Sequence, residues 1–351
     1  MYNVNIDITF GGTSAQTNYL YSDVVARINN LVLGAICSNC NYPAQQDFVR
    51  IERGRDIQNV LPNNWTNSIF HRTLEYIAPS VIMILYKDIA ALTDINTPKP
   101  DMILMHDDDY SIADFNVLGH TAANIDALFI ANTSNLSLVD NNLYFPNAPE
   151  VKSYTSIVFG NIFLHNKGYF VWNAAEYIIR IANKHYLGNY FCPIKEKVMY
   201  GNVAQYSNNV LNIIRNNHFN YPYKNIVFGP ITLSSHLFSI IYTNIVLRKV
   251  VRMTLRKFLF RKNGPELWSE VESELRRTLS YFESSDCGPY IINVLVNDPQ
   301  INSPNSNQLN VEIQYANAAG FAGFNIPSAN GSNVPPLGRF INTINVYVNL
   351  V

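Results

Sequence analysis

Apolar and polar residues alternate at both ends of the chain. The first ten residues carry apolar side chains at every second position, namely Tyr2, Val4, Ile6, Ile8 and Phe10. A period of two residues predicts a β-strand with one buried face. Residues 340–351 are rich in β-branched side chains and predict a second strand, which a turn-rich segment from Pro327 to Gly338 precedes. Both termini are therefore expected to be strands that flexible links join to the body.

The most regular pattern lies between residues 226 and 326. It predicts a long basic helix from Ser235 to about Phe260, a break at Asn263-Gly264-Pro265 and a second helix from Glu266 to Phe282. Asn263 is the expected N-cap of the second helix. The apolar face of that helix has helical spacing and consists of Leu267, Val271, Leu275, Leu279 and Phe282.

Two strands are predicted to follow these helices, at residues 290–297 and 309–315. In the second strand, apolar residues alternate with Asn310, Glu312 and Gln314, so one of its faces is expected to be wet. Two helices packed on a small sheet form an α+β domain.

The middle of the chain mixes short apolar runs with helical segments. Residues 102–105, 125–131 and 156–163 predict buried strands, and residues 172–182 predict a helix. Alternating strands and helices indicate an α/β domain. Residues 21–100 mix helical and strand patterns, and no fold is predicted for them. The predicted organisation is a mixed α/β and α+β chain with these parts: an N-terminal β-arm and linker (1–20), an unassigned region (21–100), an α/β middle domain (101–225), a C-terminal core domain (226–326), and a linker with a C-terminal β-arm (327–351).

The composition points to a surface that neighbours cover. Charged residues make up 15% of the 351 residues, against about a quarter in ordinary soluble proteins, while the chain holds 47 Asn, 22 Tyr and 19 Phe. Interface cores are similarly depleted in charge and enriched in aromatic residues. The nucleotide bias of an AT-rich genome is an equally good explanation of the Asn content.

Charge and hydropathy exclude several function classes. A net charge of −1 gives no overall attraction to nucleic acid or to a membrane surface. No apolar run has the roughly 18 residues of a spanning helix, so no stable membrane insertion is predicted. The first ten residues lack the features of a secretion signal, and four Cys in so long a chain do not form a disulfide framework. Synthesis in a reducing cytoplasm is expected.

Two clusters could carry chemistry. His106-Asp107-Asp108-Asp109, with Asp114 nearby, could bind a divalent metal, but consecutive Asp residues point in different directions, and a solvated acidic turn is the favoured interpretation. Cys37-Ser38-Asn39-Cys40 has C-x-x-C spacing without a second ligand pair, and it is interpreted as two unrelated thiols. No catalytic residue, metal site or cofactor is predicted.

The basic helix has no acidic residue between His236 and Lys262. Like charges at helical spacing repel, and an acidic partner would relieve that repulsion. The wider basic patch and the interleaved aromatic residues of a nucleic-acid surface are missing. An acidic protein surface is therefore the preferred partner of the helix, and nucleic acid is not expected to be one.

Several short segments, taken in order, resemble the contractile-tail sheath proteins of phages, R-type pyocins and related injection systems. Residues 226–233 (IVFGPITL) are similar to the segment v-w-G-x-r-T-l of that family, and residues 243–249 (TNIVLRK) to i-N-v-r-R. Residues 258–263 (FLFRKN), followed by Leu267-Trp268, resemble f-v-F-e-p-N…l-W. Further similar segments are 182–193, 210–215, 309–315 and 319–326.

The resemblance implies a structural, non-enzymatic protein that polymerises into a contractile helical sheath around an inner tail tube. In such sheaths the terminal strands enter neighbouring subunits and complete a sheet there, which is β-augmentation. The implied arm residues are Val4, Ile6, Ile8, Ile344, Val346 and Val348. The implied arm-accepting residues are Ile292, Val294, Val311 and Ile313.

The resemblance also implies partners for the basic helix. Arg248, Lys249, Arg252 and Arg256 are expected to face the tube, and baseplate and tail terminator proteins are further expected partners, in a virion tail assembled in the host cytoplasm. Two alternatives stay open: another virion component, such as a tail terminator, baseplate or capsid protein, and a metal-dependent enzyme that uses His106–Asp109.

Overall fold

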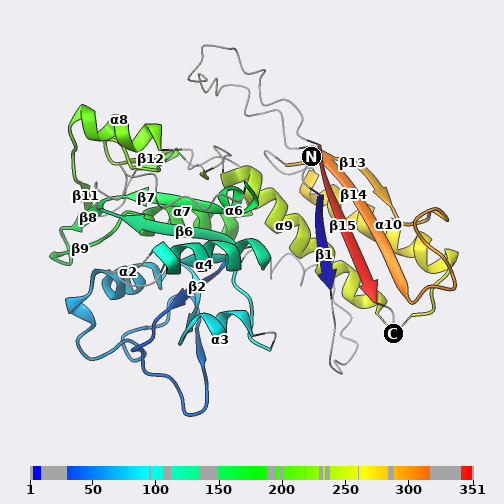
Figure 1. The fold of residues 1–351 in the computed structure, drawn as a ribbon, viewed down its shortest axis with the longest axis horizontal. Coiled ribbons are helices and arrows are strands. Elements are labelled where there is room, and N and C mark those ends of the chain that lie inside the picture. The colour runs from blue at the N-terminus through cyan, green and yellow to red at the C-terminus, as the bar shows by residue number, and fades with distance from the viewer. Residues whose placement is uncertain are drawn as a thin grey trace. The chain divides into compact units, whose positions relative to one another are not determined.

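The computed structural model of the chain describes most of the residues between two short terminal strands. The described residues are 3–8, 30–94, 96–105, 112–125, 127–134, 149–188, 195–197, 201–217, 219–228, 232–233, 238–259, 261–283, 288–316 and 341–349. They fall into two compact units (Figure 1). The larger unit comprises Asn29–Gly188 and Pro193–Ile241, and the smaller comprises Met1–Ile28, Asn189–Cys192 and Tyr242–Val351.

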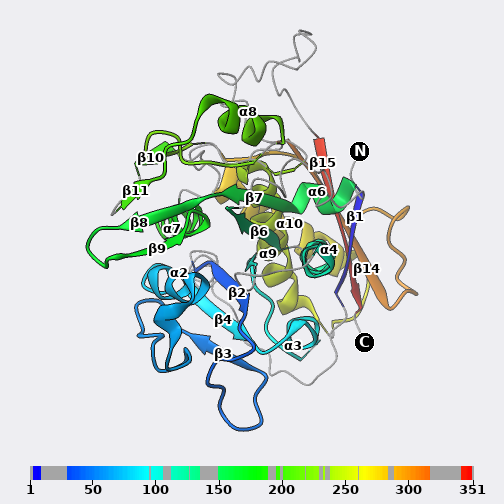
Figure 2. The same cartoon turned by 60° about the vertical axis from the view of Figure 1, so that its left-hand side comes forward.

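A six-stranded sheet in the order β3-β4-β2-β5-β6-β7 forms the centre of the larger unit (Figure 2). All neighbouring strands run parallel except β3, which is antiparallel to β4. The strands are β2 (Val32–Ile36), β3 (Phe48–Ile51), β4 (Ile82–Tyr86), β5 (Met102–Leu104), β6 (Leu128–Thr133) and β7 (Thr155–Phe159). Every residue of β4 and β6 is buried, which explains why β4 and the first four residues of β6 are apolar throughout.

Helices cover this sheet and complete its core. They are η1 (Trp65–Asn67), α2 (Ile69–Ile77), α3 (Ile89–Thr93), α4 (Ile112–Asn124), α6 (Pro149–Tyr154), α7 (Ala174–Tyr186) and α8 (Asn208–Asn216). Phe129 of β6 packs in one cluster with Phe115 and Leu118 of α4. Asn132, further along β6, fixes the start of α7, because its Oδ1 accepts the backbone N–H of Ala174 at 3.1 Å.

Two small sheets complete the larger unit. The strands β8 (Asn161–Leu164), β9 (Tyr169–Trp172) and β11 (Gly201–Val203) form a three-stranded sheet in the order β11-β8-β9. The strands β10 (Lys195–Lys197) and β12 (Ile226–Phe228) form an antiparallel pair.

The smaller unit consists of helices and a four-stranded sheet. Its helices are α9 (Phe238–Leu255, with its first turn assigned to the larger unit), η2 (Arg256–Phe258) and α10 (Pro265–Glu283). Its strands are β1 (Asn3–Ile8), β13 (Tyr290–Leu295), β14 (Gln308–Ala316) and β15 (Ile341–Asn349), in the order β1-β15-β14-β13 (Figure 1). The apolar face predicted for α10 is buried at every position, and so are the four apolar positions of β14.

The mixed fold class is confirmed, with an α/β body and a C-terminal unit of helices on a small sheet. The large sheet crosses the boundary predicted between residues 100 and 101, because β2 pairs with both β4 and β5. Residues 30–100, to which the sequence assigned no fold, thus supply half of this sheet. Among the described residues, no helix has the length and apolar character needed to cross a bilayer.

Candidate assembly site

The C-terminal strand pairs along the whole length of β14. Nine residues of β15 face nine residues of β14 in antiparallel register, with Val346 opposite Val311 and Ile344 opposite Ile313. Val311 and Ile313 are buried. In this structure the chain therefore occupies the edge of β14 with its own C-terminal strand.

The N-terminal strand extends the same sheet. β1 runs parallel to β15, and its register places Val4 opposite Ile344, Ile6 opposite Val346 and Ile8 opposite Val348. Both predicted arms are therefore strands of one sheet, and β15 lies between β1 and β14.

The strand β13 has a different place from the one expected. It pairs with β14 and lies at the far edge of the sheet from β15 and β1, and its register shifts between Ile291 and Asn293. Ile292 and Val294, predicted to accept an arm, thus lie on a strand that pairs with β14 and not with β15 or β1. The apolar and polar residues of β13 correctly predicted a strand, but they do not show which strand pairs with each of its two edges.

Asn263 holds the connection between β13 and β14 rather than capping α10. Its Nδ2 lies 2.9, 2.7 and 3.3 Å from the carbonyl oxygens of Ser303, Ser306 and Gln308. Its Oδ1 accepts the indole N–H of Trp268 at 2.6 Å. Asn263 thus joins the start of α10 to the segment that leads into β14.

Glu272 of α10 fixes the other end of that connection. Its Oε2 accepts the backbone N–H groups of Val296 and Asn297 at 3.3 and 3.1 Å, and its Oε1 pairs with Arg276. Burial by itself raises the pKa of Glu272, but these two N–H groups and Arg276 outweigh it and leave the pKa below its ordinary value.

The basic helix exposes less charge than the sequence suggests. Arg248 is only 3% exposed and therefore cannot face a tube in this structure, while Lys249 and Arg252 are half-buried and Arg256 is exposed. Burial lowers the pKa of Arg248 to about 10, although the nearby Tyr315 of β14 raises it. Arg248 belongs to the interior of the smaller unit.

Acidic partners for the cations beyond α9 come from within the chain. Lys257 lies 2.5 Å from Glu274, and Arg261 lies 2.7 Å from Glu270, both acidic residues being on α10. The repulsion that was expected to require a separate acidic protein is thus partly relieved by the second helix of the same unit.

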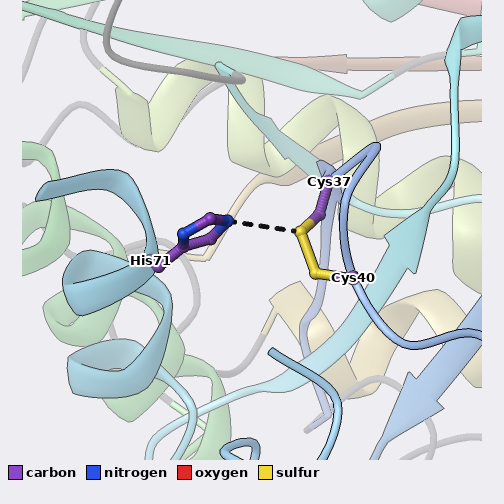
Figure 3. Close-up of side chains that lie close together, drawn as sticks. All are labelled: Cys37, Cys40 and His71. Atoms are coloured by element: carbon purple, nitrogen blue, oxygen red, sulfur yellow. Dashed lines mark hydrogen bonds between the residues drawn. A yellow bond between two sulfur atoms is a disulfide. The ribbon is translucent and has the colours of Figure 1, made fainter. Parts of the chain in front are cut away.

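The interpretation of Cys37 and Cys40 as unrelated thiols is wrong. The two sulfurs are joined in a disulfide, and His71 Nε2 lies 3.6 Å from Cys37 Sγ (Figure 3). All three side chains are buried. Among the described residues they are the one group of three metal-ligating side chains that converge. The C-x-x-C spacing pointed to the pair, but nothing in the sequence indicated that a His 31 residues further on would join it.

Two further buried charged residues form an ion pair inside the larger unit. Glu176 and Arg180 of α7 are almost completely buried and lie 2.8 Å apart, and Tyr76 donates to Glu176 Oε1 at 2.5 Å. A buried pair one helical turn apart fixes α7 against α2. The candidate metal cluster His106–Asp109, and the side chain of Asp114, lie outside the described residues.

Comparison with known proteins identifies the fold. No model of a known protein family matches the chain, and no curated protein matches its sequence. The chain is similar to one in the cryo-EM structure of the anti-feeding prophage helical sheath in the contracted state, with a TM-score of 0.58 and 12% identity, over 89% of this chain and 96% of that chain.

Two further structures agree. A chain of the sheath complex of an extracellular contractile injection system (PVC), in the contracted state, gives a TM-score of 0.59 at 9% identity, over 84% of this chain and 88% of that chain. A chain of the anti-feeding prophage baseplate gives 0.57 at 11% identity, over 84% and 89%. At these identities the similarity establishes a shared fold, and the predicted contractile-sheath fold is confirmed.

Proposed function

We propose that this chain, which has the fold of contractile-sheath subunits, is itself a sheath subunit that polymerises around a tail tube. The observation that carries the proposal is the extent of the structural match, which covers 96% of a contracted sheath chain and 89% of this one. The similarity is therefore not restricted to one common α/β module. The particle would be a virion tail or a related injection system, assembled in the host cytoplasm.

We further propose that subunits exchange their terminal strands. Antiparallel neighbours such as β14 and β15 can be joined by a hairpin of about 2–5 residues. Here residues 317–340 connect them, and a segment of that length could span roughly 80 Å when extended. Such a connection allows β15 to pair with β14 of a neighbour in the same register, since the alternating side chains that set the register are identical in every copy.

Strand exchange can be tested by cross-linking variants that each carry one added cysteine. Val311→Cys and Val346→Cys are prepared as separate proteins, because these residues are opposite each other in the register. When the two proteins are mixed during assembly and oxidised, exchange predicts a disulfide-linked dimer on a non-reducing gel. Either variant alone is the control. Tubes that form without this heterologous dimer would reject exchange between β14 and β15.

The N-terminal strand is tested separately by truncation. Removal of residues 1–10 is expected to abolish long tubes in negative-stain images while leaving a folded monomer. Ile6→Asn should weaken assembly, whereas Asn5→Ser, at the alternate position of the same strand, is the matched control. Long tubes formed by the truncated chain would contradict a role of β1 in linking subunits.

We place the tube-facing surface on Lys249, Arg252 and Arg256, and leave out Arg248 because its side chain is buried. Reversal of charge at Arg252 and Arg256 should weaken association with the tube, and the loss should grow smaller as salt screens the interaction. Lys224→Glu, at an exposed cation of the larger unit, is the control. Unchanged tube binding by the double variant would exclude this surface.

A baseplate component is the second candidate, because a chain of a baseplate structure also matches. Electron microscopy of the purified assembly separates the two functions. Striated tubes of variable length support a sheath subunit, whereas closed rings that do not elongate support a baseplate component.

A further inference from the structure

The cluster of Cys37, Cys40 and His71 lies at the carboxyl end of the large parallel sheet. Cys37 directly follows β2, and the order of the parallel strands, β4-β2-β5-β6-β7, reverses beside this strand. In open α/β sheets, ligands bind outside the carboxyl ends of the strands, where the strand order reverses. The cluster therefore lies at the edge of the sheet where this architecture commonly binds ligands, with its pocket on the β4 side of β2.

The backbone around the two cysteines is held on several sides. The backbone N–H of Cys37 donates to Tyr86 O at 2.9 Å, and the Tyr42 hydroxyl donates to Cys37 O at 2.7 Å. The next residue after the pair, Asn41, donates its backbone N–H to Val60 O at 2.7 Å. Tyr86 and Val60 belong to two other parts of the larger unit, and Tyr42 to the loop itself, so the loop is held by bonds other than the sulfur–sulfur bond.

His71 is positioned just as firmly. It lies in the first turn of α2, where its backbone N–H donates to the Ser68 hydroxyl at 3.3 Å, and its ring packs against Phe70 at 5.5 Å between centroids. Its imidazole points toward Cys37 (Figure 3). His71 is held by a helix, and the two cysteines by a fixed loop. Little conformational entropy is therefore lost when these side chains bind an ion.

The distance between Cys37 Sγ and His71 Nε2 fits a tetrahedral zinc site, and the two sulfurs would have to move apart on reduction to bind the same ion. With Zn–S of about 2.3 Å and Zn–N of about 2.05 Å, a tetrahedral angle places the two ligand atoms about 3.6 Å apart. Cys37 Sγ and His71 Nε2 are 3.6 Å apart. Thiolate and imidazole ligands select Zn²⁺ over the hard cations Mg²⁺ and Ca²⁺. A pocket of about 460 Å³ opens beside the cluster, lined in part by Asn39, Lys87 and Asp88, and has room for a water as the fourth ligand.

We propose that Cys37, Cys40 and His71 bind one Zn²⁺ ion when the two cysteines are reduced, and that the disulfide is the metal-free state of the same site. Reduction by a thiol or dithiol reductant cleaves the sulfur–sulfur bond and gives two thiols, while the reductant is oxidised to its own disulfide. Zn²⁺ then displaces both thiol protons, and neutral His71 donates its Nε2 lone pair. The metal-bound form belongs to a reducing compartment and the disulfide to an oxidising one.

The test is the zinc content of the full chain in its two redox states. Protein reduced with a phosphine under anaerobic conditions is incubated with Zn²⁺, freed of unbound metal and analysed by mass spectrometry for elements. We expect one Zn²⁺ per reduced chain and none per oxidised chain. Co²⁺ in place of Zn²⁺ should give the intense thiolate-to-cobalt absorption of a tetrahedral sulfur-containing site.

Variants identify the ligands. Cys37→Ser, Cys40→Ser and His71→Ala should each lose stoichiometric zinc, whereas Cys287→Ser and His165→Ala should retain it. If a ligand variant fails to fold, as judged by circular dichroism, the oxidised wild-type chain serves as the metal-free comparison without any substitution. A reduced chain that retains no zinc, an oxidised chain that binds as much as the reduced one, or equal loss in ligand and control variants would overturn the proposal.

Discussion

Asn263 offers the sharpest test of how the smaller unit presents β14. Its side chain is buried and binds the connection that leads into this strand on one side and the indole of Trp268 on the other. Replacement by Ala removes these bonds without altering the backbone of α10 or the apolar face beneath it. The expected result is local loosening of β13 and β14.

The size of the effect follows from the contacts. The amide nitrogen has two protons for three carbonyl oxygens, so it makes two full hydrogen bonds, and Oδ1 accepts a third. At about 1 kcal/mol each, the loss is about 3 kcal/mol, and the buried indole N–H of Trp268 is left without its acceptor. A change of 1 kcal/mol moves the melting temperature of a small domain by about 4–8 °C, so a fall of more than about 10 °C is expected for this unit.

Hydrogen–deuterium exchange measures this locally. A loss of about 3 kcal/mol corresponds to roughly 150-fold faster exchange of the amides of β13 and β14 that open with the whole unit, while β4 and β6 in the larger unit should be unchanged. Asn307→Ala, at an exposed Asn of the same connection, is the control and should change stability by less than about 0.5 kcal/mol. Exchange in β13 and β14 that stays within about threefold of wild type would refute the role assigned to Asn263.

Three further predictions concern the stability of the two units. Glu176→Ala should cost about 3–5 kcal/mol in urea unfolding, because it leaves Arg180 buried without its carboxylate; a loss below about 1 kcal/mol would contradict this. The lowered pKa of Glu272 adds stability that is present above its unfolded-state pKa of about 4.3 and is lost as the pH falls through its lower folded-state pKa, so Glu272→Gln should flatten stability measured between about pH 5 and pH 2. Gly34→Ala should cost about 1–3 kcal/mol, because a Cβ there would lie 2.7 Å from Cγ of Pro100; an unchanged melting temperature would show that the loop yields freely.

Much of the smaller unit was predictable because its elements have one buried and one wet face. The period of 3.6 residues in α10 and the period of two in β14 each name the buried residues directly, and all of them are buried. The N-terminal strand was predicted from its period of two, and the C-terminal strand from its β-branched residues. In amphipathic helices and strands, the spacing of apolar residues therefore indicates which side chains are buried.

The large sheet was harder to predict because its central strands have no wet face. Ile82–Tyr86 is apolar throughout and lies in a region that also holds helix α2, so periodicity could not distinguish strand from helix. Its partner β2 is equally buried over most of its length. That one sheet is formed becomes clear only from the structure, in which β2 pairs with β4 before residue 100 and with β5 after it.

Polar residues in the interior were the other source of error. The sequence attributed the many Asn residues to surfaces, yet Asn263, Asn173 and Asn302 are buried and bind backbone carbonyls. Arg248 likewise looked like one member of a cationic face, but it is buried and lies near Tyr315, which is 67 positions away in the chain. Such pairings are tertiary, and no local pattern reveals them.

The position of β15 between β1 and β14 determines how the sheet would carry load. The hydrogen bonds of a ladder lie across the strands, so a pull along the axis of β15 strains all nine positions shared with β14 and the six shared with β1 at the same time. A pull at right angles would instead open the pairs one after another from the strand end. If β15 links two subunits, the link is strong in tension along the strand and weak to peeling from its end.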